Sequence, residues 1–155
     1  MLKSIEGNFD HPEVHELLVK HFIELRSVSP EGSAHVLDIN GLKDPTITFW
    51  SLWESNNLMG SGALKFLDKN HGEFKSIRVN DKFRDQGYGI KVIHHLIGEA
   101  KKLDIKRLSL ETGAGDFFAP ARKLFTKCGF KTCEPFSHYK YDINSVYMSM
   151  LIGNN

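Results

Sequence analysis

The sequence predicts a mixed α/β fold, in which a mostly antiparallel central sheet of six to seven strands carries helices on both faces. Three observations lead to this fold class. Three strand-like runs follow one another through short, turn-rich connectors, two amphipathic helices come after them, and a further strand-like run separates those helices. A chain of 155 residues is of a size to form one domain, so we expect residues 1–155 to fold as a single unit.

The first periodic segment is a helix over residues 12–26. Its apolar residues fall on one helical face, namely Val14, Leu17, Leu18, Phe22 and Leu25. Pro12 suits the first turn of this helix, and Asp10 is expected to cap it. Residues 27–45 are interrupted by prolines and glycines, which predicts a loop with short helical turns.

Three strands are predicted next, at residues 46–54, 57–67 and 71–79. The connectors ESNN and LDKNHG between them are short and rich in turn-forming residues. Such connectors favour neighbouring strands that run antiparallel, so we expect a meander.

The second half of the chain alternates helices and strands. A long helix follows the stretch FRDQGYG, and its apolar residues form an amphipathic stripe of Ile90, Ile93, Leu96, Ile97, Ala100 and Leu103. Residues 106–112 are the next strand, parallel to the strand before the helix because a helix crosses between them. A second amphipathic helix lies within 116–130 and ends at Gly129. Closing strands are predicted at 130–133 and 145–152, so the order, with a strand ahead of the first helix, is β-α-loop-βββ-α-β-α-ββ.

The composition excludes several classes of protein. A formal net charge of +1 is too small for broad binding to nucleic acid or to anionic membranes. The polar start MLKSIEGNFDHPEV is unlike a signal peptide, and no apolar run approaches the ~20 residues of a membrane span. Cys128 and Cys133 match no disulfide or zinc pattern, so we expect reduced thiols in a cytoplasmic protein. His11 and His15 lack an evident third ligand, and no metal is expected.

The stretch FRDQGYGIK at 83–91 places two glycines where the long helix begins. The first N–H groups of a helix are unpaired and its dipole is positive there, so this end favours a phosphate. One alternative is a dinucleotide-binding fingerprint, with Glu111 about 20 residues further on, but Val92 occupies the position of its third glycine. A second alternative is a simple helix-entry turn, although one glycine would satisfy that.

Two motifs carry a resemblance to a known family. The stretch RDQGYG at 84–89 resembles the R/Q-x-x-G-x-G/A motif of the GNAT superfamily of N-acetyltransferases, which also follows a strand and opens a long helix. Independently, AxxLFxxxGF at 121–130 resembles the A-x-x-L-Y-x-x-x-G-F helix ending of that superfamily. The match is strongest over 71–131, and the order of elements extends it over nearly the whole chain.

The resemblance implies that acetyl-CoA is the co-substrate. In the family the fourth and fifth strands splay apart, and the pantetheine arm of acetyl-CoA lies between them. The implied roles are main-chain pairing with that arm by the strand before the loop, and binding of the pyrophosphate by the loop. The implied cofactor-binding residues are Ile77, Val79, Arg84, Gln86, Gly87, Tyr88, Gly89 and Ile90.

Acetylation of an amine requires a base, because an alkylammonium has a pKa near ~10.4. Glu73 is the first candidate, since many relatives carry a basic glutamate on this strand and Glu73 shares strand parity with Ile77 and Val79. Glu111 at the end of the neighbouring strand is the second candidate. The alternative for Glu73 is a salt bridge with a lysine of the sheet surface, Lys65 or Lys75.

One departure from the family concerns the acid. Phe125 stands where the family usually has a tyrosine that protonates the leaving sulfur. The alternatives for this acid are Tyr139, Tyr141 and Cys128. For Cys128 we favour the role of a small buried apolar residue.

The acceptor site is implied to lie between segments 27–45 and 134–145. Four side chains are expected to be available to a substrate carboxylate there: His71, Lys75, Arg78 and His138. The motifs GExK, LETG and PFxxY are similar to a bacterial branch with small-molecule substrates. We therefore expect acetyl transfer to a small primary amine such as an amino acid, and a homodimer is left open. The alternatives are a protein or peptide acceptor, and a non-catalytic acyl-CoA sensor or interaction module.

Overall fold

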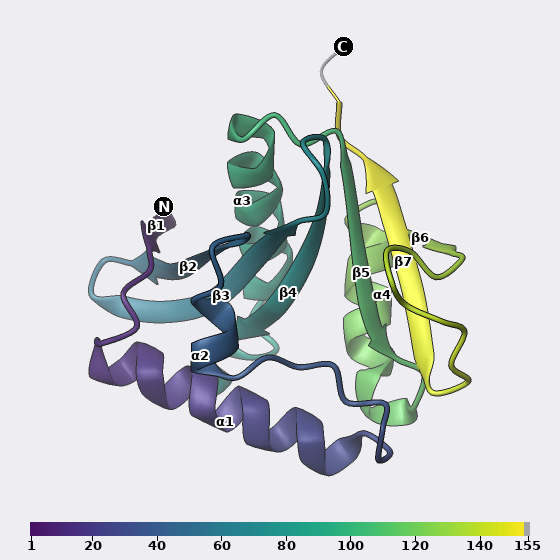
Figure 1. Ribbon diagram of the computed structural model, residues 1–155. Helices are drawn as coiled ribbons and strands as arrows, with labels where there is room; N and C mark the ends of the chain where they lie inside the picture. Colours follow the sequence, from purple (N-terminus) through teal and green to yellow (C-terminus); the bar gives the residue numbers. More distant parts are fainter. Residues whose placement is uncertain (154–155) are drawn as a thin grey trace.

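The computed structural model describes residues 1–153, and these contain one mixed sheet of seven strands (Figure 1). The strands are β1 (Lys3–Glu6), β2 (Ile47–Glu54), β3 (Asn57–Phe66), β4 (His71–Val79), β5 (Arg107–Gly113), β6 (Lys131–Cys133) and β7 (Ser145–Leu151). Their spatial order is β1-β2-β3-β4-β5-β7-β6. Neighbours run antiparallel except β4 and β5, which are parallel across the α3 crossover. The predicted fold class is confirmed.

Helices cover both faces of this sheet (Figure 1). They are α1 (Pro12–Val28), α2 (Ile39–Leu42), α3 (Tyr88–Lys102) and α4 (Ala119–Lys127). One cap was predicted wrongly. Because Pro12 is the first helical residue, the capping position is His11, whose Nδ1 accepts a hydrogen bond from the Glu13 N–H at 3.1 Å. Asp10 lies one residue too early for this role.

Each face of the sheet buries its own apolar cluster. On one side, α3 and α4 pack on the sheet through a large cluster that includes Ile93, Leu96 and Phe125. On the other side, α1 and α2 bury a smaller cluster that includes Leu18 and Leu42. Within residues 1–153, no helix is long and apolar enough to cross a membrane.

The feature that positions the site is the separation of β4 from β5. Their pairing covers only His71, Gly72 and Glu73 on β4, with Ser109 the last partner on β5. Beyond Ser109, β5 pairs with β7 alone, as far as Gly113. Within residues 1–153, the rest of β4 therefore has β3 on one side and no strand on the other (Figure 1). This is the splay that the resemblance implies.

A β-bulge at Ser76 overturns the parity argument for Glu73. Ser76 has a φ of 53°, and the pairing of β4 with β3 shifts at this point. The extra residue shifts the alternation of side chains between the two faces of the sheet. Ile77 and Val79 therefore pack against the cluster under α3. Glu73 lies on the opposite face, which α1 and the late loop (residues 134–144) cover, and it accepts a hydrogen bond there from Tyr139.

Candidate active site

The loop between β4 and α3 presents an open helix N-terminus. Gly87 is the N-cap of α3 with a φ of 84°, a left-handed conformation that favours glycine, and no side chain caps this end. A Cβ built on Gly87 would have no neighbour within 4 Å. The loop is therefore shaped by an unusual backbone and faces open space, which fits an anion at the helix terminus.

Gly89 serves packing between helices as well. A Cβ at this position would lie 2.6 Å from Cδ2 of Leu124 on α4, so the absence of a side chain lets α3 and α4 approach. The side chains around the loop contact the protein itself. Arg84 pairs with Asp81 at 2.9 Å, and the Tyr88 hydroxyl donates to Glu54 at 3.0 Å. In this conformation the backbone, more than these side chains, is free to meet a ligand.

Arg78 is buried in an ion-pair network between β4 and α1. Its guanidinium donates to Glu24 at 3.0 Å and to Asp81 at 3.1 Å, and it lies 3.4 Å from Nδ1 of His21. The expectation that Arg78 recognises a substrate carboxylate is wrong, because two carboxylates of the protein already neutralise it. The network ties the start of the loop between β4 and α3 to α1.

The pH dependence of stability follows from His21. Burial, with a smaller contribution from the Arg78 charge, lowers the pKa of His21 from 6.5 to about 4. Between these two values, His21 takes up a proton in the unfolded chain but not in the folded protein. The contribution of neutral His21 to the free energy of unfolding is therefore fully present above pH 6.5 and is lost as the pH falls toward 4. The loss amounts to about 3 kcal/mol.

We expect His21→Gln to flatten the unfolding free energy measured by urea titration across this pH range. His15→Gln, an exposed histidine on the same helix, is the control and should leave the profile unchanged. Identical pH profiles for the parent and His21→Gln would contradict this assignment.

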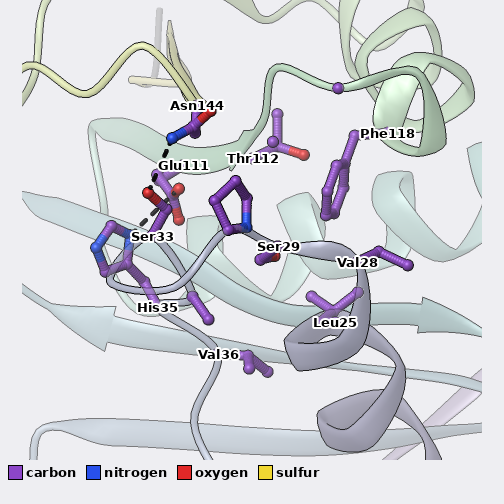
Figure 2. Close-up of a pocket in the computed structure, with 14 residues that line it drawn as sticks. Leu25, Val28, Ser29, Ser33, His35, Val36, Glu111, Thr112, Phe118 and Asn144 are labelled. Atoms are coloured by element: carbon purple, nitrogen blue, oxygen red, sulfur yellow. Dashed lines mark hydrogen bonds and ion pairs between the residues drawn. The ribbon is translucent and has the colours of Figure 1, made fainter.

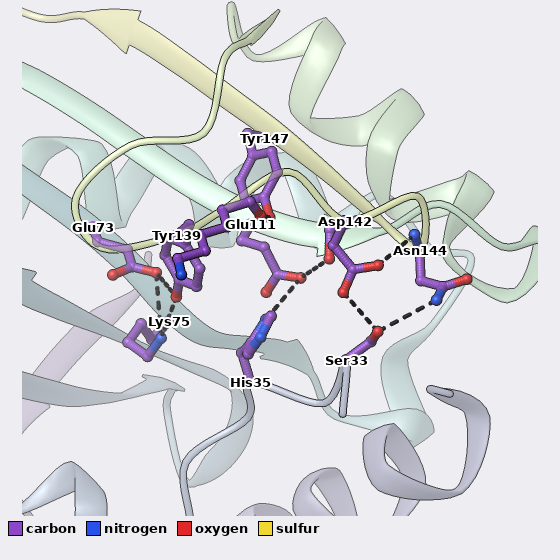
Figure 3. A network of polar contacts seen from close by, with 11 residues as sticks. Ser33, His35, Glu73, Lys75, Glu111, Tyr139, Asp142, Asn144 and Tyr147 are labelled. Atoms are coloured by element: carbon purple, nitrogen blue, oxygen red, sulfur yellow. Dashed lines mark hydrogen bonds and ion pairs between the residues drawn. The ribbon is translucent and has the colours of Figure 1, made fainter. Parts of the chain in front are cut away.

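A buried polar cluster lies where β4 and β5 separate (Figure 3). Glu73 is 1% exposed, and its Oε2 accepts from the Tyr139 hydroxyl at 2.6 Å and from Lys75 Nζ at 3.2 Å. Its other oxygen, Oε1, is buried without a hydrogen-bond partner among the described residues. A buried carboxylate with one free oxygen is a candidate proton acceptor.

The second carboxylate, Glu111, lies on β5 and faces the loop that follows α1 (Figure 3). Its Oε2 accepts from Ser145 Oγ at 2.7 Å and lies 3.3 Å from Nδ1 of His35. Tyr139 lies between the two carboxylates (Figure 3). Burial raises the pKa of its phenol well above the usual value, and the charge of Glu73, the hydrogen bond to Glu73 and the charge of Glu111 raise it further.

Beside Glu111 is a cavity of about 200 Å³ (Figure 2). Its walls come from the end of α1, the loop after it, the end of β5, the segment between β5 and α4, and the late loop. The lining residues are Leu25, Val28, Ser29, Pro30, Ser33, Ala34, His35, Val36, Glu111, Thr112, Gly113, Gly115, Phe118 and Asn144. Hydrogen bonds of Ser33 with Asp142 at 2.7 Å and with Asn144 at 3.3 Å join the two loops over this cavity.

Comparison with known proteins decides the family. The Acetyltransferase (GNAT) family matches residues 11–130. The N-acetyltransferase YsnE of Bacillus subtilis is 46% identical over 137 residues, which are 88% of this chain and 91% of that protein. The chain belongs to the GNAT acetyltransferase family. A second relative, the N-acetyltransferase YedL of Escherichia coli, is 40% identical over 145 residues, with 94% of this chain and 91% of that protein covered.

The fold of this GNAT acetyltransferase also matches solved structures. A Bacillus subtilis acetyltransferase in complex with CoA superposes with a TM-score of 0.72 over 98% of this chain and 99% of that one, at 17% identity. As a member of the family, the protein is an acyltransferase of the acetyl-CoA-dependent kind.

The missing tyrosine distinguishes this GNAT acetyltransferase from the usual family pattern. Phe125 is buried and packs edge-on against Phe130 in the core, so it has no polar function. Burial raises the pKa of the Cys128 thiol, which fits the expected role as a core residue. Tyr141 is 77% exposed, and Tyr139 already donates to Glu73. None of the three alternatives to the missing tyrosine (Cys128, Tyr139 and Tyr141) is therefore placed as a ready proton donor to a leaving sulfur.

Sequence reasoning missed the contacts that assemble the site. The hydrogen bond between Tyr139 and Glu73 spans 66 residues of chain, and no local spacing indicates it. His35 and Asn144 were not singled out either. The only signal for them was the assignment of 27–45 and 134–145 as acceptor segments, and the structure places both at the cavity.

Proposed function

We propose that the protein transfers an acetyl group from acetyl-CoA to the primary amine of a small molecule, with both substrates bound together. The observation that carries this proposal is the gap between β4 and β5, which opens at Glu73 and Ser109. The open N-terminus of α3 follows the end of β4, and two carboxylates and a cavity flank the gap. A co-substrate in the gap would thus have its phosphates at a helix dipole and its acyl end near an acceptor pocket.

The residues that fit acetyl-CoA are those of β4 and the loop. Ile77 and Val79 lie on the stretch of β4 that has no strand on its β5 side, so their main chain is free to pair with an extended arm. The N–H groups from Gln86 to Ile90, around Gly87, would hold the pyrophosphate. When bound, acetyl-CoA supplies an acetyl group activated as a thioester.

The chemistry asked of the protein is removal of a proton from the incoming ammonium. Glu73 is our proposed base, because its Oε1 is free of other partners and Tyr139 and Lys75 fix its Oε2. Glu111 is proposed to meet the amine in the cavity. The leaving thiolate has a reference pKa near ~8.5, so the absence of a tyrosine at Phe125 is tolerable.

Thermal unfolding tests the proposal first. Acetyl-CoA at about 100 times its Kd should stabilise the fold by ~2.7 kcal/mol, and hence raise the Tm by about 5–10 °C. NAD should not change the Tm, because the loop lacks the third glycine of a dinucleotide site. Release of free CoA thiol with a panel of small amines then measures transfer. A shift with NAD and none with acetyl-CoA would overturn the proposal.

A non-catalytic acyl-CoA sensor is the second candidate, and two observations favour it. Phe125 cannot protonate a sulfur, and Glu73 is covered by Tyr139 and Lys75. A sensor would show the acetyl-CoA shift without thiol release for any amine. A protein or peptide acceptor is less compatible with a cavity of only about 200 Å³.

The free thiols Cys128 and Cys133 support a proposed location in the reducing cytoplasm.

A further inference from the structure

The charges around the cavity differ from those expected for an amino-acid substrate. Among its lining residues there is one carboxylate, Glu111, and one histidine, His35, but neither lysine nor arginine. The lysine and the arginine that were expected to recognise a carboxylate are paired with carboxylates of the protein instead. Arg78 is paired with Glu24 and Asp81, and Lys75 donates to Glu73.

Apolar side chains make up much of the rest of the cavity wall, next to the neutral polar side chains of Ser29, Ser33, Thr112 and Asn144. The apolar side chains are those of Leu25, Val28, Val36 and Phe118 (Figure 2), together with Pro30. In another protein an apolar cavity of ~150 Å³ accommodates benzene, so a volume of about 200 Å³ suits a ring or a short branched chain. Such walls favour an apolar body on the acceptor, because burial of apolar surface is favourable.

Glu111 is arranged to accept hydrogen bonds from a ligand. Ser145 and His35 contact its Oε2, whereas no residue of 1–153 donates a hydrogen bond to Oε1. The side chain is 12% exposed, so a negative charge lies at the cavity wall with little water around it. A second carboxylate brought to this place would be repelled, and an amine would be attracted.

We propose that the acceptor is a small amine with an apolar body and no carboxylate, which binds in this cavity with its nitrogen at Glu111. The inference rests on the proposed function, which it narrows to one class of amine. An amino acid, the acceptor expected from the sequence, is the wrong class because its carboxylate would meet Glu111, with neither lysine nor arginine among the lining residues to offset the repulsion.

Matched pairs of acceptors test this inference. The two pairs are 3-methylbutylamine against leucine and 2-phenylethylamine against phenylalanine, each member assayed for CoA thiol release with the full chain. We expect the amine to exceed the amino acid in kcat/KM by on the order of 100-fold. Leucinamide, which keeps the bulk at the α-carbon without the charge, should stay within about tenfold of 3-methylbutylamine.

Two variants test whether Glu111 and the cavity cause the preference for amines over amino acids. Glu111→Gln should raise the KM for the amines and bring the preference over amino acids below about tenfold, since the repelling charge is gone. Ala34→Leu should fill the cavity and abolish the Tm shift that an amine adds in the presence of CoA, while the shift from acetyl-CoA itself persists.

The possible results distinguish a wrong acceptor class from a wrong proposed function. Equal turnover of amine and amino acid would overturn the inference and leave acetyl transfer intact. Loss of the acetyl-CoA shift in Ala34→Leu would assign the cavity to the co-substrate, and would also overturn the inference. An acetyl-CoA shift without thiol release for any acceptor would remove the proposed function itself, and with it the inference.

Discussion

Gly87→Asp is expected to abolish acetyl-CoA binding while the protein remains folded. Gly87 has a φ of 84°, and Asp is among the few residues other than glycine that tolerate this region. No atom lies within 4 Å of the added Cβ, and an acidic residue at a helix N-terminus is favourable. The new carboxylate would instead stand where the pyrophosphate is proposed to bind.

The expected size of the loss in acetyl-CoA affinity follows from the charge that Gly87→Asp adds. Two unit charges about 4 Å apart near a protein surface repel by ~4 kcal/mol, so we expect the Kd to rise by on the order of 10²–10³-fold in calorimetric titrations. Gly87→Asn is the matched control, because it has nearly the same shape and conformational tolerance without the charge. Unchanged affinity in a folded Gly87→Asp variant would mean that the phosphates bind somewhere else.

Gly87 is a better test position than Gly89. From the sequence the two glycines look equivalent, because both precede a helix and both belong to the same motif. The structure separates them, since a side chain at Gly89 would collide with Leu124 of α4 and disturb the packing of two helices. A loss of binding in a Gly89 variant would therefore have two explanations.

The elements of the fold were predictable from the sequence because their signals are local. Helical periodicity identified α1, α3 and α4, and turn-rich connectors identified the β2–β3–β4 meander. The parallel pairing of β4 with β5 followed from the helix between them.

The bulge at Ser76 was not predictable in the same way. It depends on how β4 meets β3, where Gly60 lets a backbone approach so close that a Cβ would lie 2.3 Å from the Arg78 carbonyl oxygen. One extra residue then reverses which face each later side chain meets. Glu73 is still the candidate base, but its side chain lies on the opposite face of the sheet from Ile77 and Val79.

The side-chain contacts of the site were the least predictable part. Glu73 with Tyr139, and Ser33 with Asp142, join segments that are 66 and 109 residues apart. Such pairs arise from the folding of two irregular loops over the sheet, and neither loop has a periodic pattern to place its side chains. The sequence indicated the correct loops and gave no information on which side chains meet.

Glu73→Gln is expected to lower kcat by ~10²–10⁴-fold at neutral pH, which is the usual contribution of a general base. The substitution keeps the shape of the side chain and its ability to accept from Tyr139 and Lys75, but removes its basicity. Acetyl-CoA affinity should change little, since the substitution leaves the loop between β4 and α3 unaltered. At higher pH the deficit should shrink, because a growing fraction of an amine with a pKa near ~10.4 is neutral without help.

The comparison that decides the role of Glu73 is the same substitution at Glu111. Glu111→Gln should act on the KM for the amine and keep the pH profile of the parent, whereas Glu73→Gln should act on kcat and move that profile to higher pH. The alternative role for Glu73 is an ion pair with Lys75, whose ammonium lies 3.2 Å from the carboxylate. If Glu73→Gln stays within about threefold of the parent from neutral to alkaline pH, far short of a general-base effect, then Glu73 and Lys75 form a structural ion pair. Proton removal would then pass to Glu111 or to solvent.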